Sequence, residues 1–370
     1  MKEKIAFVVH RYGKEVNGGA ELLCRIVAER IKDIYDVEVL TSCSLGINPW
    51  DNEYPAGEQE LNGVTVRRFP VIDGSMYPNR SIEKIGPFTP DLIDYLQENH
   101  KKYKGIILIT FNYYPTYMGL KLNLDNTIFM PTVHDGPTIR WDLYQCIFDN
   151  PRGILYNSQE EKDFILDYFK TMHIPSRLTC YGMDVPERKS EKKVCSKNYI
   201  IYAGRVSGSK NFGELNDYFL RYKKENPSDL KLVVVGKIDN NMTIKHHDDI
   251  IFKGFVTDEE KESYIENAKL LVHPSKNESL SIVLLESMSY GKPVLVNGHC
   301  AVLKGQCIRS NAGLYYTNYD EFAAELDYML SHPDVCEEMG ENGYRFVKEG
   351  YSWELVINNI TSLIDEVYVE

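Results

Sequence analysis

The strongest constraint on the fold is an alternation between short apolar runs and amphipathic segments of helical length. Apolar runs of strand length begin at Ile5, Val37, Val64, Ile106, Ile128 and Gly153, and again at Tyr199, Leu230, Ile250, Leu270 and Pro293. In intervening segments such as 19–31, apolar side chains recur at helical spacing. This alternation is typical of domains with largely parallel sheets, so the sequence predicts an α/β fold.

The alternation is interrupted once, which indicates two domains. Residues 186–196 read Pro-Glu-Arg-Lys-Ser-Glu-Lys-Lys-Val-Cys-Ser, a charged stretch almost without apolar side chains and typical of an interdomain linker. We therefore predict a first domain over 1–184, a linker over 185–198 and a second domain over 199–351. Residues 44–63 are polar and aperiodic, which predicts a long loop beside the first sheet.

Composition excludes several classes of protein. No apolar stretch approaches the ~20 residues that cross a bilayer, and the N-terminal residues lack the apolar core of a signal peptide, so we expect a cytoplasmic protein. The net charge is −12, with −5 up to Asp184 and −7 beyond it, which argues against nucleic acid as a partner. A local basic patch, and with it peripheral contact with the inner membrane face, stays open. The eight scattered cysteines form no C-x-x-C pair and are interpreted as buried small side chains.

Two glycine-containing turns follow predicted strands, at the edge where parallel sheets bind ligands. The pair Gly18-Gly19 opens a helix but matches neither the dinucleotide fingerprint nor the phosphate loop. It would let the backbone approach an anion or a sugar, or form a simple tight turn. After the strand that begins at Tyr199, Arg205 and Lys210 present two cations suited to a diphosphate, unless both are ordinary surface residues.

The third candidate segment, 274–294, runs from a strand through a turn and a helix to the next strand. Its Glu278 and Glu286 are eight residues apart, which corresponds to about 12 Å of helical rise, too far for an acid/base pair on one bond. They could hold opposite ends of an extended ligand. Free amides near residues 280–283 would then face the ligand's anionic centre.

In these motifs the chain resembles family 4 of the retaining glycosyltransferases, which have the GT-B architecture of two Rossmann-like domains facing across a cleft. The matching segments are Glu278 with Glu286, Gly204-Arg205 with Lys210, Gly254-Phe255-Val256, Gly18 to Glu21, Val133-His134-Asp135, Asn157-Ser158, Tyr181 to Asp184 and Tyr351 to Glu354. The resemblance covers nearly the whole chain and implies that residues 352–370 pack back on the first domain.

The resemblance also implies roles for single residues. Arg205 and Lys210 would bind the donor diphosphate, and Glu278 and Glu286 would accept hydrogen bonds from the donor sugar and from the ribose. His134 would lie near the reacting carbon, unless its imidazole only completes the core. The donor site would be completed by Gly18, Gly19, Gly204, Val256, Ser279, Leu280, Ser281 and Ile282.

The implied reaction is metal-independent, front-face transfer of a hexose from a nucleoside diphosphate sugar to a hydroxyl of a glycan or lipid-linked acceptor. A UDP-sugar is the favoured donor, polysaccharide biosynthesis the expected process, and no cofactor is expected because two cations can replace a metal. The alternatives are an inactive sugar-nucleotide-binding relative and another GT-B enzyme such as an epimerase. Many relatives carry Glu-Gly-Phe-Gly where this chain has Glu278-Ser279-Leu280-Ser281, so Leu280 could alter which sugar fits.

Overall fold

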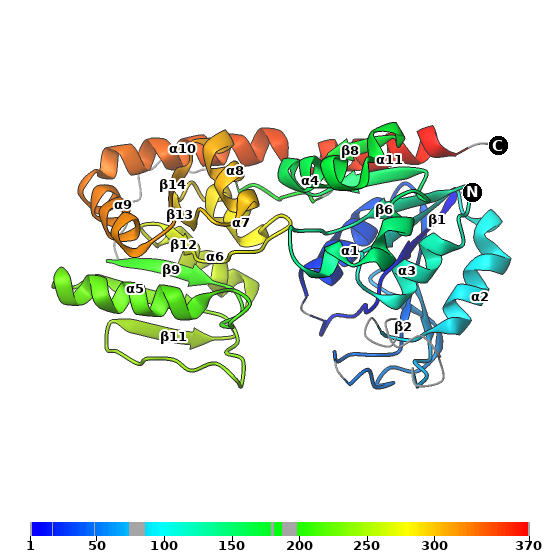
Figure 1. Ribbon diagram of the computed structural model, residues 1–370, viewed down its shortest axis with the longest axis horizontal. Coiled ribbons are helices and arrows are strands. Elements are labelled where there is room, and N and C mark those ends of the chain that lie inside the picture. The colour runs from blue at the N-terminus through cyan, green and yellow to red at the C-terminus, as the bar shows by residue number, and fades with distance from the viewer. Residues whose placement is uncertain are drawn as a thin grey trace. The chain divides into compact units, whose positions relative to one another are not determined.

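The computed structural model describes residues 2–16, 18–47, 49–73, 86–178, 181–186 and 198–368. The chain divides into two compact units (Figure 1). The first unit comprises Met1–Gly182 together with Glu354–Glu370, and the second comprises Met183–Trp353. Most of the predicted linker, residues 187–197, lies outside the described residues.

The first unit is built on an eight-stranded sheet with the order β3-β4-β2-β1-β5-β6-β7-β8. All neighbouring strands are parallel except β3, which runs antiparallel to β4. The strands are β1 (Lys4–Val8), β2 (Asp36–Ser42), β3 (Gly57–Leu61), β4 (Val64–Phe69), β5 (Gly105–Ile109), β6 (Thr127–Met130), β7 (Gly153–Tyr156) and β8 (Ser176–Leu178).

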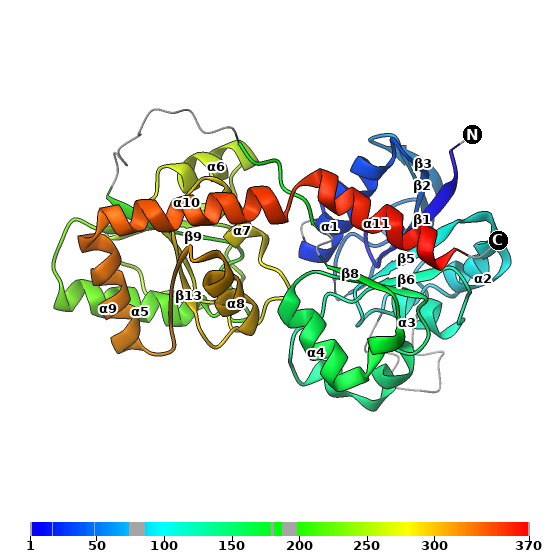
Figure 2. The same ribbon diagram turned by 90° about the horizontal axis from the view of Figure 1, so that it is seen from above.

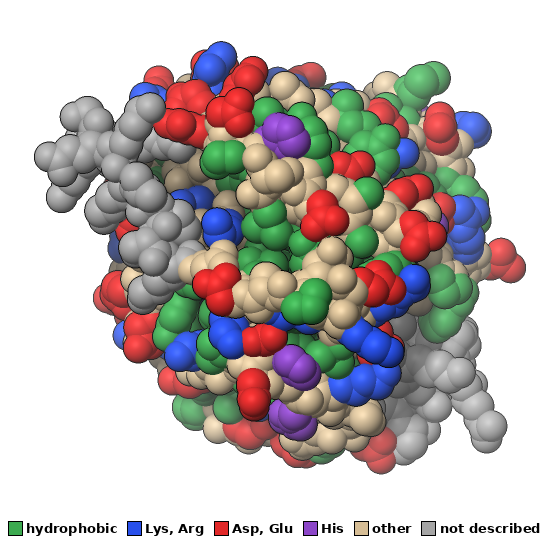
Figure 3. Space-filling view, turned by 90° about the vertical axis from the view of Figure 1, so that its left-hand side faces the viewer, with side chains coloured by type: hydrophobic (Ala, Val, Ile, Leu, Met, Phe, Trp, Pro, Cys, Tyr) green, Lys and Arg blue, Asp and Glu red, His purple; other side chains and the backbone are tan. Residues whose placement is uncertain are grey.

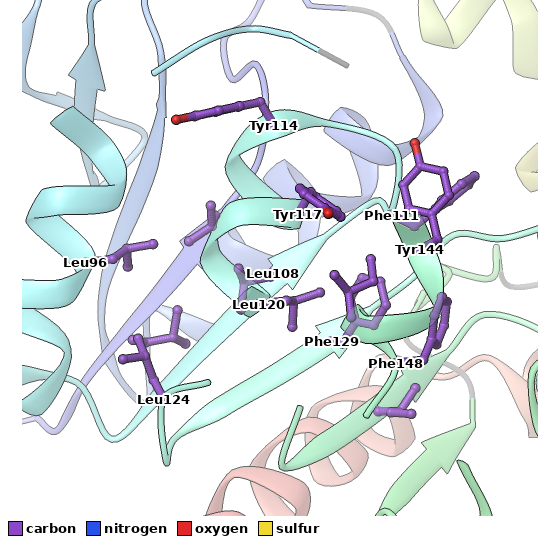
Figure 4. Packing of buried hydrophobic residues seen from close by; sticks show 14 of the residues in the cluster. Leu96, Leu108, Phe111, Tyr114, Tyr117, Leu120, Leu124, Phe129, Tyr144 and Phe148 are labelled. Atoms are coloured by element: carbon purple, nitrogen blue, oxygen red, sulfur yellow. The ribbon is translucent and has the colours of Figure 1, made fainter. Parts of the chain in front are cut away.

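Helices cover both faces of this sheet because its strands carry apolar side chains on both sides. The helices are α1 (Gly19–Ile31), α2 (Pro90–Asn99), α3 (Tyr114–Lys121), α4 (Gln159–Phe169) and α11 (Trp353–Val367), with short 3-10 turns at His100–Lys102, Thr138–Arg140, Asp142–Ile147 and Thr171–His173. Figure 4 shows the core on one face, where Leu96 of α2 and Leu120 of α3 lie with Leu108 of β5 and Phe129 of β6.

The C-terminal helix α11 packs on the first unit (Figure 2). A Cβ atom added at Gly105 of β5 would lie 3.4 Å from Ile364, and one at Gly153 of β7 would lie 3.1 Å from Leu363. On β8, the Leu178 carbonyl accepts a hydrogen bond from the Asn359 amide. The end of the chain therefore completes the core of its first part.

The second unit has a six-stranded, wholly parallel sheet with the order β11-β10-β9-β12-β13-β14. The strands are β9 (Tyr199–Ala203), β10 (Lys231–Val235), β11 (Ile250–Gly254), β12 (Leu271–His273), β13 (Val294–Asn297) and β14 (Gly313–Tyr316). The helices are α5 (Phe212–Glu225), α6 (Asp258–Glu266), α7 (Ile282–Ser289), α8 (Ala301–Ser310), α9 (Tyr319–Ser331) and α10 (Pro333–Gly350). In Figure 2 the strands lie between α5 and α9 on one side and α6 and α7 on the other.

The predicted α/β class with largely parallel sheets is confirmed. The prediction that residues 44–63 form only a loop is wrong, because they include β3. Four of the five residues of β3 are exposed, and the strand pairs with β4 through backbone hydrogen bonds, so hydrophobic periodicity gave no signal for it.

The starts of two helices carry the Ser/Thr-x-x-Glu pattern of a capping box, and one of the two boxes is complete. At α6 the Thr257 hydroxyl accepts from the Glu260 amide, and the Glu260 carboxylate accepts from the Thr257 amide. At α4 only the Ser158 hydroxyl fulfils its half of the motif. The Glu161 carboxyl instead accepts from the amides of Val133 and Asn157, and so ties the ends of β6 and β7 together.

The charged side chains on the surface are distributed as expected for a chain with a net charge of −12 and no basic excess. Figure 3 shows acidic and basic side chains intermixed over the face that it presents. None of the described helices is both long and apolar enough to cross a membrane. Of the cysteines in the described ranges, Cys24, Cys43, Cys300 and Cys307 are buried, whereas Cys146 is exposed.

Candidate functional site

The candidate site is the edge of the second sheet at which its parallel strands end. Strands β9 and β12 are neighbours in the middle of the sheet, and β10 adjoins β9. Gly204 and Arg205 follow β9, Gly236 follows β10, and the loop that carries Glu278 follows β12. The topology therefore brings together segments that lie up to 74 residues apart in the sequence.

Two glycines bring the turns after β9 and β10 into close contact. Gly204 has φ of 142° and Gly236 has φ of 143°, a region that side-chain-bearing residues rarely adopt. A Cβ atom on Gly236 would lie 1.8 Å from the Gly204 carbonyl oxygen. Gly236 is thus required by the packing of these two turns, and Gly204 is favoured by its backbone conformation, whether or not a ligand also approaches it.

Lys210 and Glu278 form an ion pair across this edge, with Lys210 Nζ 2.7 Å from Glu278 Oε1. The Glu278 side chain is 9% exposed, and His273 Nε2 lies 3.3 Å from the same oxygen. Burial alone would raise the pKa of Glu278, but its interactions with His273 and Lys210 outweigh burial and lower the pKa to about 2. Glu278 is therefore a carboxylate at neutral pH, able to accept hydrogen bonds.

Glu286, in the middle of α7, pairs with a lysine that sequence analysis did not single out. Lys261 Nζ of α6 lies 2.9 Å from Glu286 Oε1 and 3.2 Å from Asp258. Burial raises the pKa of Glu286 despite this neighbour. Burial would lower the pKa of Lys261, but the two carboxylates outweigh it and raise that pKa. In the sequence, this pair was indicated only by the presence of a basic residue, Lys261, in the helix that precedes α7.

The loop between these two carboxylates leads into the start of α7. Leu280 is buried, whereas Ser279 and Ile282 are partly exposed. Ser281 has φ of 66° and caps α7 without a side-chain hydrogen bond, and its buried hydroxyl has no partner among the described residues. The first amides of α7 point away from the helix, as amides at any helix N-terminus do, toward this edge of the sheet.

Arg205 and Val256 stand at the exposed rim. The Arg205 carbonyl accepts a 2.6 Å hydrogen bond from the Tyr202 hydroxyl, which fixes its backbone and leaves the side chain exposed. Val256 is half-buried after Gly254, whose φ is 69°, and Phe255 between them is 74% exposed. A cavity of about 480 Å³ opens on the same edge and is lined by Gly208 and residues 237–242.

The remaining predicted residues, Gly18, Gly19 and His134, belong to the first unit. A Cβ atom on Gly18 would lie 2.0 Å from a carboxylate oxygen of Glu21, whereas one on Gly19 would meet nothing within 4 Å. Gly18 is therefore required by packing beneath the turn. Only Gly19 has open space in front of it.

Glu21 belongs to a buried cluster that the sequence did not reveal. Its Oε1 lies 2.8 Å from His10 Nε2 and 3.1 Å from Arg11 Nε. The His10 ring stacks on Tyr113 with a centroid distance of 3.6 Å. Burial lowers the pKa of His10, whereas hydrogen bonds and charge from His10 and Arg11 outweigh burial at Glu21 and bring its pKa to about 2. The sequence pattern Gly18-Gly19-Ala20-Glu21 indicated a turn before a helix, but it did not indicate that Glu21 contacts His10 and Arg11.

His134 follows β6, two strands from β1 on the same edge of the first sheet. Its side chain is exposed, which disfavours the interpretation of His134 as a core imidazole. The neighbouring Asp135 pairs with Arg140 at 2.6 Å. Among the residues that the structure describes, no group of three or more His, Cys, Asp or Glu side chains is placed to hold a metal ion.

Comparison with known proteins gives one matching family and several relatives. Residues 185–346, less than half of the chain, match the family described as Glycosyl transferases group 1. An alpha-monoglucosyldiacylglycerol synthase of Streptococcus pneumoniae is 25% identical over 219 residues, which cover 54% of this chain and 49% of that protein. The chain thus spans about half the length of this curated relative.

Two solved structures resemble the whole chain. Sucrose-phosphate synthase from Thermosynechococcus elongatus matches with a TM-score of 0.75 at 16% identity, over 99% of both chains. HepE from Anabaena, solved in complex with UDP and glucose, matches with a TM-score of 0.70 at 16% identity, over 98% of this chain and 100% of that chain. The chain has the GT-B fold. Its two Rossmann-like domains agree with the predicted fold class.

Proposed function

We propose that this chain is a retaining hexosyltransferase of glycosyltransferase family 4. It transfers a hexose from a nucleoside diphosphate sugar to a hydroxyl of a glycan or lipid-linked acceptor. The observation that carries the proposal is the Lys210–Glu278 ion pair beside the exposed Arg205, at the sheet edge where a GT-B fold binds its ligands. The match of residues 185–346 to a glycosyltransferase family supports the assignment.

The donor binds along this edge in an extended conformation. Its diphosphate lies between Arg205, Lys210 and the first amides of α7. The Arg205 guanidinium can donate two parallel hydrogen bonds, the Lys210 ammonium supplies a compact positive charge, and the amides donate backbone hydrogen bonds. Glu278 accepts hydrogen bonds from hydroxyls of the sugar, and Glu286 accepts them from the ribose. Both carboxylates form ion pairs with lysines, and the donor binds beside these pairs.

Transfer breaks the bond between the anomeric carbon and the diphosphate oxygen, while the acceptor hydroxyl attacks from the face that the diphosphate leaves. The hydroxyl proton passes to the departing diphosphate, and the anomeric configuration is retained. Arg205 and Lys210 stabilise the charge that builds on the leaving group, which is usually the largest catalytic contribution of such residues. No metal is required, because the two cations take over this role.

UDP is the proposed nucleotide, supported by the similarity to a protein solved with UDP and glucose. A lipid-linked acceptor is supported by the relative whose name includes diacylglycerol. Such an acceptor would bring the protein to a membrane surface as a peripheral contact, within polysaccharide or glycolipid assembly. Leu280, buried beside Glu278, is proposed to help select the sugar.

A thermal-shift panel with EDTA present tests the proposal. UDP, GDP, ADP and their common sugar conjugates are compared, since a ligand at 100 times its dissociation constant adds about 2.7 kcal/mol of stability. We expect a clear rise in melting temperature with UDP and UDP-hexose, followed by hexose transfer with retained anomeric configuration, read by proton NMR. Loss of binding and turnover in EDTA would contradict metal independence, and no shift with any nucleotide would contradict the transferase assignment.

A further inference from the structure

His273 is the last residue of β12 and lies beneath the candidate site, with 3% of its surface exposed. Its Nε2 atom is 3.3 Å from Glu278 Oε1. Its Nδ1 atom is buried and has no hydrogen-bond partner in the described part of the chain. The contact with Glu278 is therefore the polar interaction that the structure records for this imidazole.

The chemistry of the pair fixes which nitrogen carries hydrogen. Glu278 is ionised and can only accept hydrogen bonds, so Nε2 must present its N–H to the carboxylate. A hydrogen at Nδ1 in place of Nε2 would leave a buried donor without an acceptor, which is costly.

The two partners of Glu278 converge on one of its oxygens. Lys210 Nζ lies 2.7 Å from Oε1 and His273 Nε2 lies 3.3 Å from the same atom, while among the described residues no hydrogen bond or ion pair involves Oε2. Lys210 has a long, flexible side chain that is 35% exposed, whereas His273 belongs to a buried strand. The strand residue is therefore the more rigid of the two anchors for a carboxylate that sits in a loop.

We propose that His273 is a positioning residue, which holds Oε1 of Glu278 from below and so directs Oε2 toward the hydroxyls of the donor sugar. This inference rests on the proposed function, because it assigns the free oxygen to the sugar of the donor. It extends that function by naming a residue that touches neither substrate nor leaving group. Misplacing a contact group by about 1 Å costs up to about 100-fold in rate.

The test compares His273→Leu with His273→Gln, whose amide N–H can replace the imidazole Nε2–H. His332→Leu is the matched control, since His332 is an exposed histidine at the end of α9. We expect His273→Leu to lower kcat/KM for the sugar donor by about 10- to 100-fold. We expect inhibition by the free nucleoside diphosphate, which lacks the sugar, to change less than about twofold, and His273→Gln to recover part of the loss.

Two results with the single His273 variants would overturn the proposal. One is a His273→Leu enzyme with unchanged kcat/KM. The other is a parallel loss of melting temperature and of nucleoside diphosphate affinity in both His273 variants, which indicates a purely structural role. In a Glu278→Gln background, adding His273→Leu should cost nothing further, and an additive loss would also contradict the proposal.

A measurement that needs no substrate separates this inference from the proposed function. NMR of the imidazole nitrogens in the intact protein is expected to show hydrogen at Nε2 and a bare Nδ1 for His273, a pattern that Glu278→Leu should weaken. Hydrogen at Nδ1 instead would overturn the positioning role even if the enzyme transfers sugar. Absent turnover with the expected NMR pattern would count against the proposed function and leave the His273–Glu278 geometry supported.

Discussion

The edges at which the two sheets end differ in how their charges are used. In the second unit, Glu278 and Glu286 are paired with lysines that are 35% and 26% exposed, and Arg205 is exposed beside them. In the first unit, Glu21 is held by His10 and Arg11, whose side chains are 1% and 10% exposed. The edge of the second sheet presents charged side chains to solvent and to ligands. At the edge of the first sheet, the charged side chains are buried and stabilise a turn.

This contrast predicts different responses to substitution at the two edges. Changes in the second unit should reduce donor binding and turnover with little effect on folding. Changes in the first unit should mainly reduce the free energy of unfolding, except at Gly19, which has open space in front of it. Five substitutions test this, taken from the largest expected effect to the smallest.

Arg205→Ala is expected to lower kcat by about 10²- to 10³-fold, because a cation aimed at the departing diphosphate is lost. The melting temperature should stay near that of the wild type, since the side chain is exposed. Arg221→Ala on α5, which removes an arginine paired with Glu225 on the surface, is the matched control. Steady-state kinetics with the donor found in the thermal-shift panel make the comparison, and near-normal turnover of Arg205→Ala would refute its role.

Glu21→Gln is expected to lower the free energy of unfolding by about 3 kcal/mol, because a buried ion pair then loses one partner. Glu29→Gln, at a half-buried glutamate of the same helix, keeps an oxygen that can accept from the Asn62 side chain and should change it by less than about 0.5 kcal/mol. Chemical denaturation measures both. If Glu21→Gln were as stable as Glu29→Gln, the buried cluster would not be the support of the turn.

The cost of Glu21→Gln should also depend on pH. The pKa of Glu21 is about 2 in the folded chain against an ordinary value of 4.5, so its carboxylate stabilises the fold fully above pH 4.5. This contribution is lost as the pH falls toward 2. The difference in unfolding free energy between wild type and Glu21→Gln should therefore shrink over that range, and a constant difference would show that charge is not its cause.

Glu286→Gln is expected to weaken binding of UDP by about 10-fold, because hydrogen bonds to a charged acceptor contribute about 1.5 kcal/mol or more. The control is a change of the ligand and not of the protein. Binding of 2′,3′-dideoxy-UDP, which lacks the ribose hydroxyls, should be equally weak in both proteins. Calorimetric titration compares the four combinations, and an equal loss for both nucleotides would remove Glu286 from the ribose site.

Gly18→Ala and Gly19→Ala form the closest matched pair. The first methyl group meets the Glu21 carboxylate and should destabilise the fold by about 1 to 3 kcal/mol. The second meets open space at the start of α1 and should leave stability unchanged or slightly raised. Gly19→Ala is expected to reduce turnover a few-fold because its methyl group narrows that space. Equal effects of the two substitutions on stability and turnover would contradict the different roles given to the two glycines.

Much of the fold was predictable because strand-length apolar runs alternate with helical periodicity, as at 5–8 and 19–31. The edge strand β3 was not predictable, since its exposed side chains carry no periodic signal. In the site, Arg205, Lys210, Glu278 and Glu286 were found from residue type and spacing. The contacts of Glu278 with His273 and of Glu286 with Lys261 were not.

The missed partners share one physical cause. His273 and Lys261 meet their glutamates through folding, across five and twenty-five positions of sequence, with no motif that encodes the contact. Gly18 was expected either to let the backbone approach a ligand or to form a tight turn, and the Glu21 carboxylate lies beneath it. Sequence spacing identifies residues able to bind a ligand, and only three-dimensional contacts show which of them are already engaged by the protein itself.

The most direct test of the central claim is calorimetric titration of UDP, in EDTA, into the wild-type protein and into Arg205→Ala and Glu21→Gln. We predict one site per chain in the wild type, binding at least 10-fold weaker in Arg205→Ala, and unchanged affinity in the folded Glu21→Gln protein. Equal affinity in wild type and Arg205→Ala, or no binding of any nucleoside diphosphate, would contradict a donor site at the edge of the second sheet.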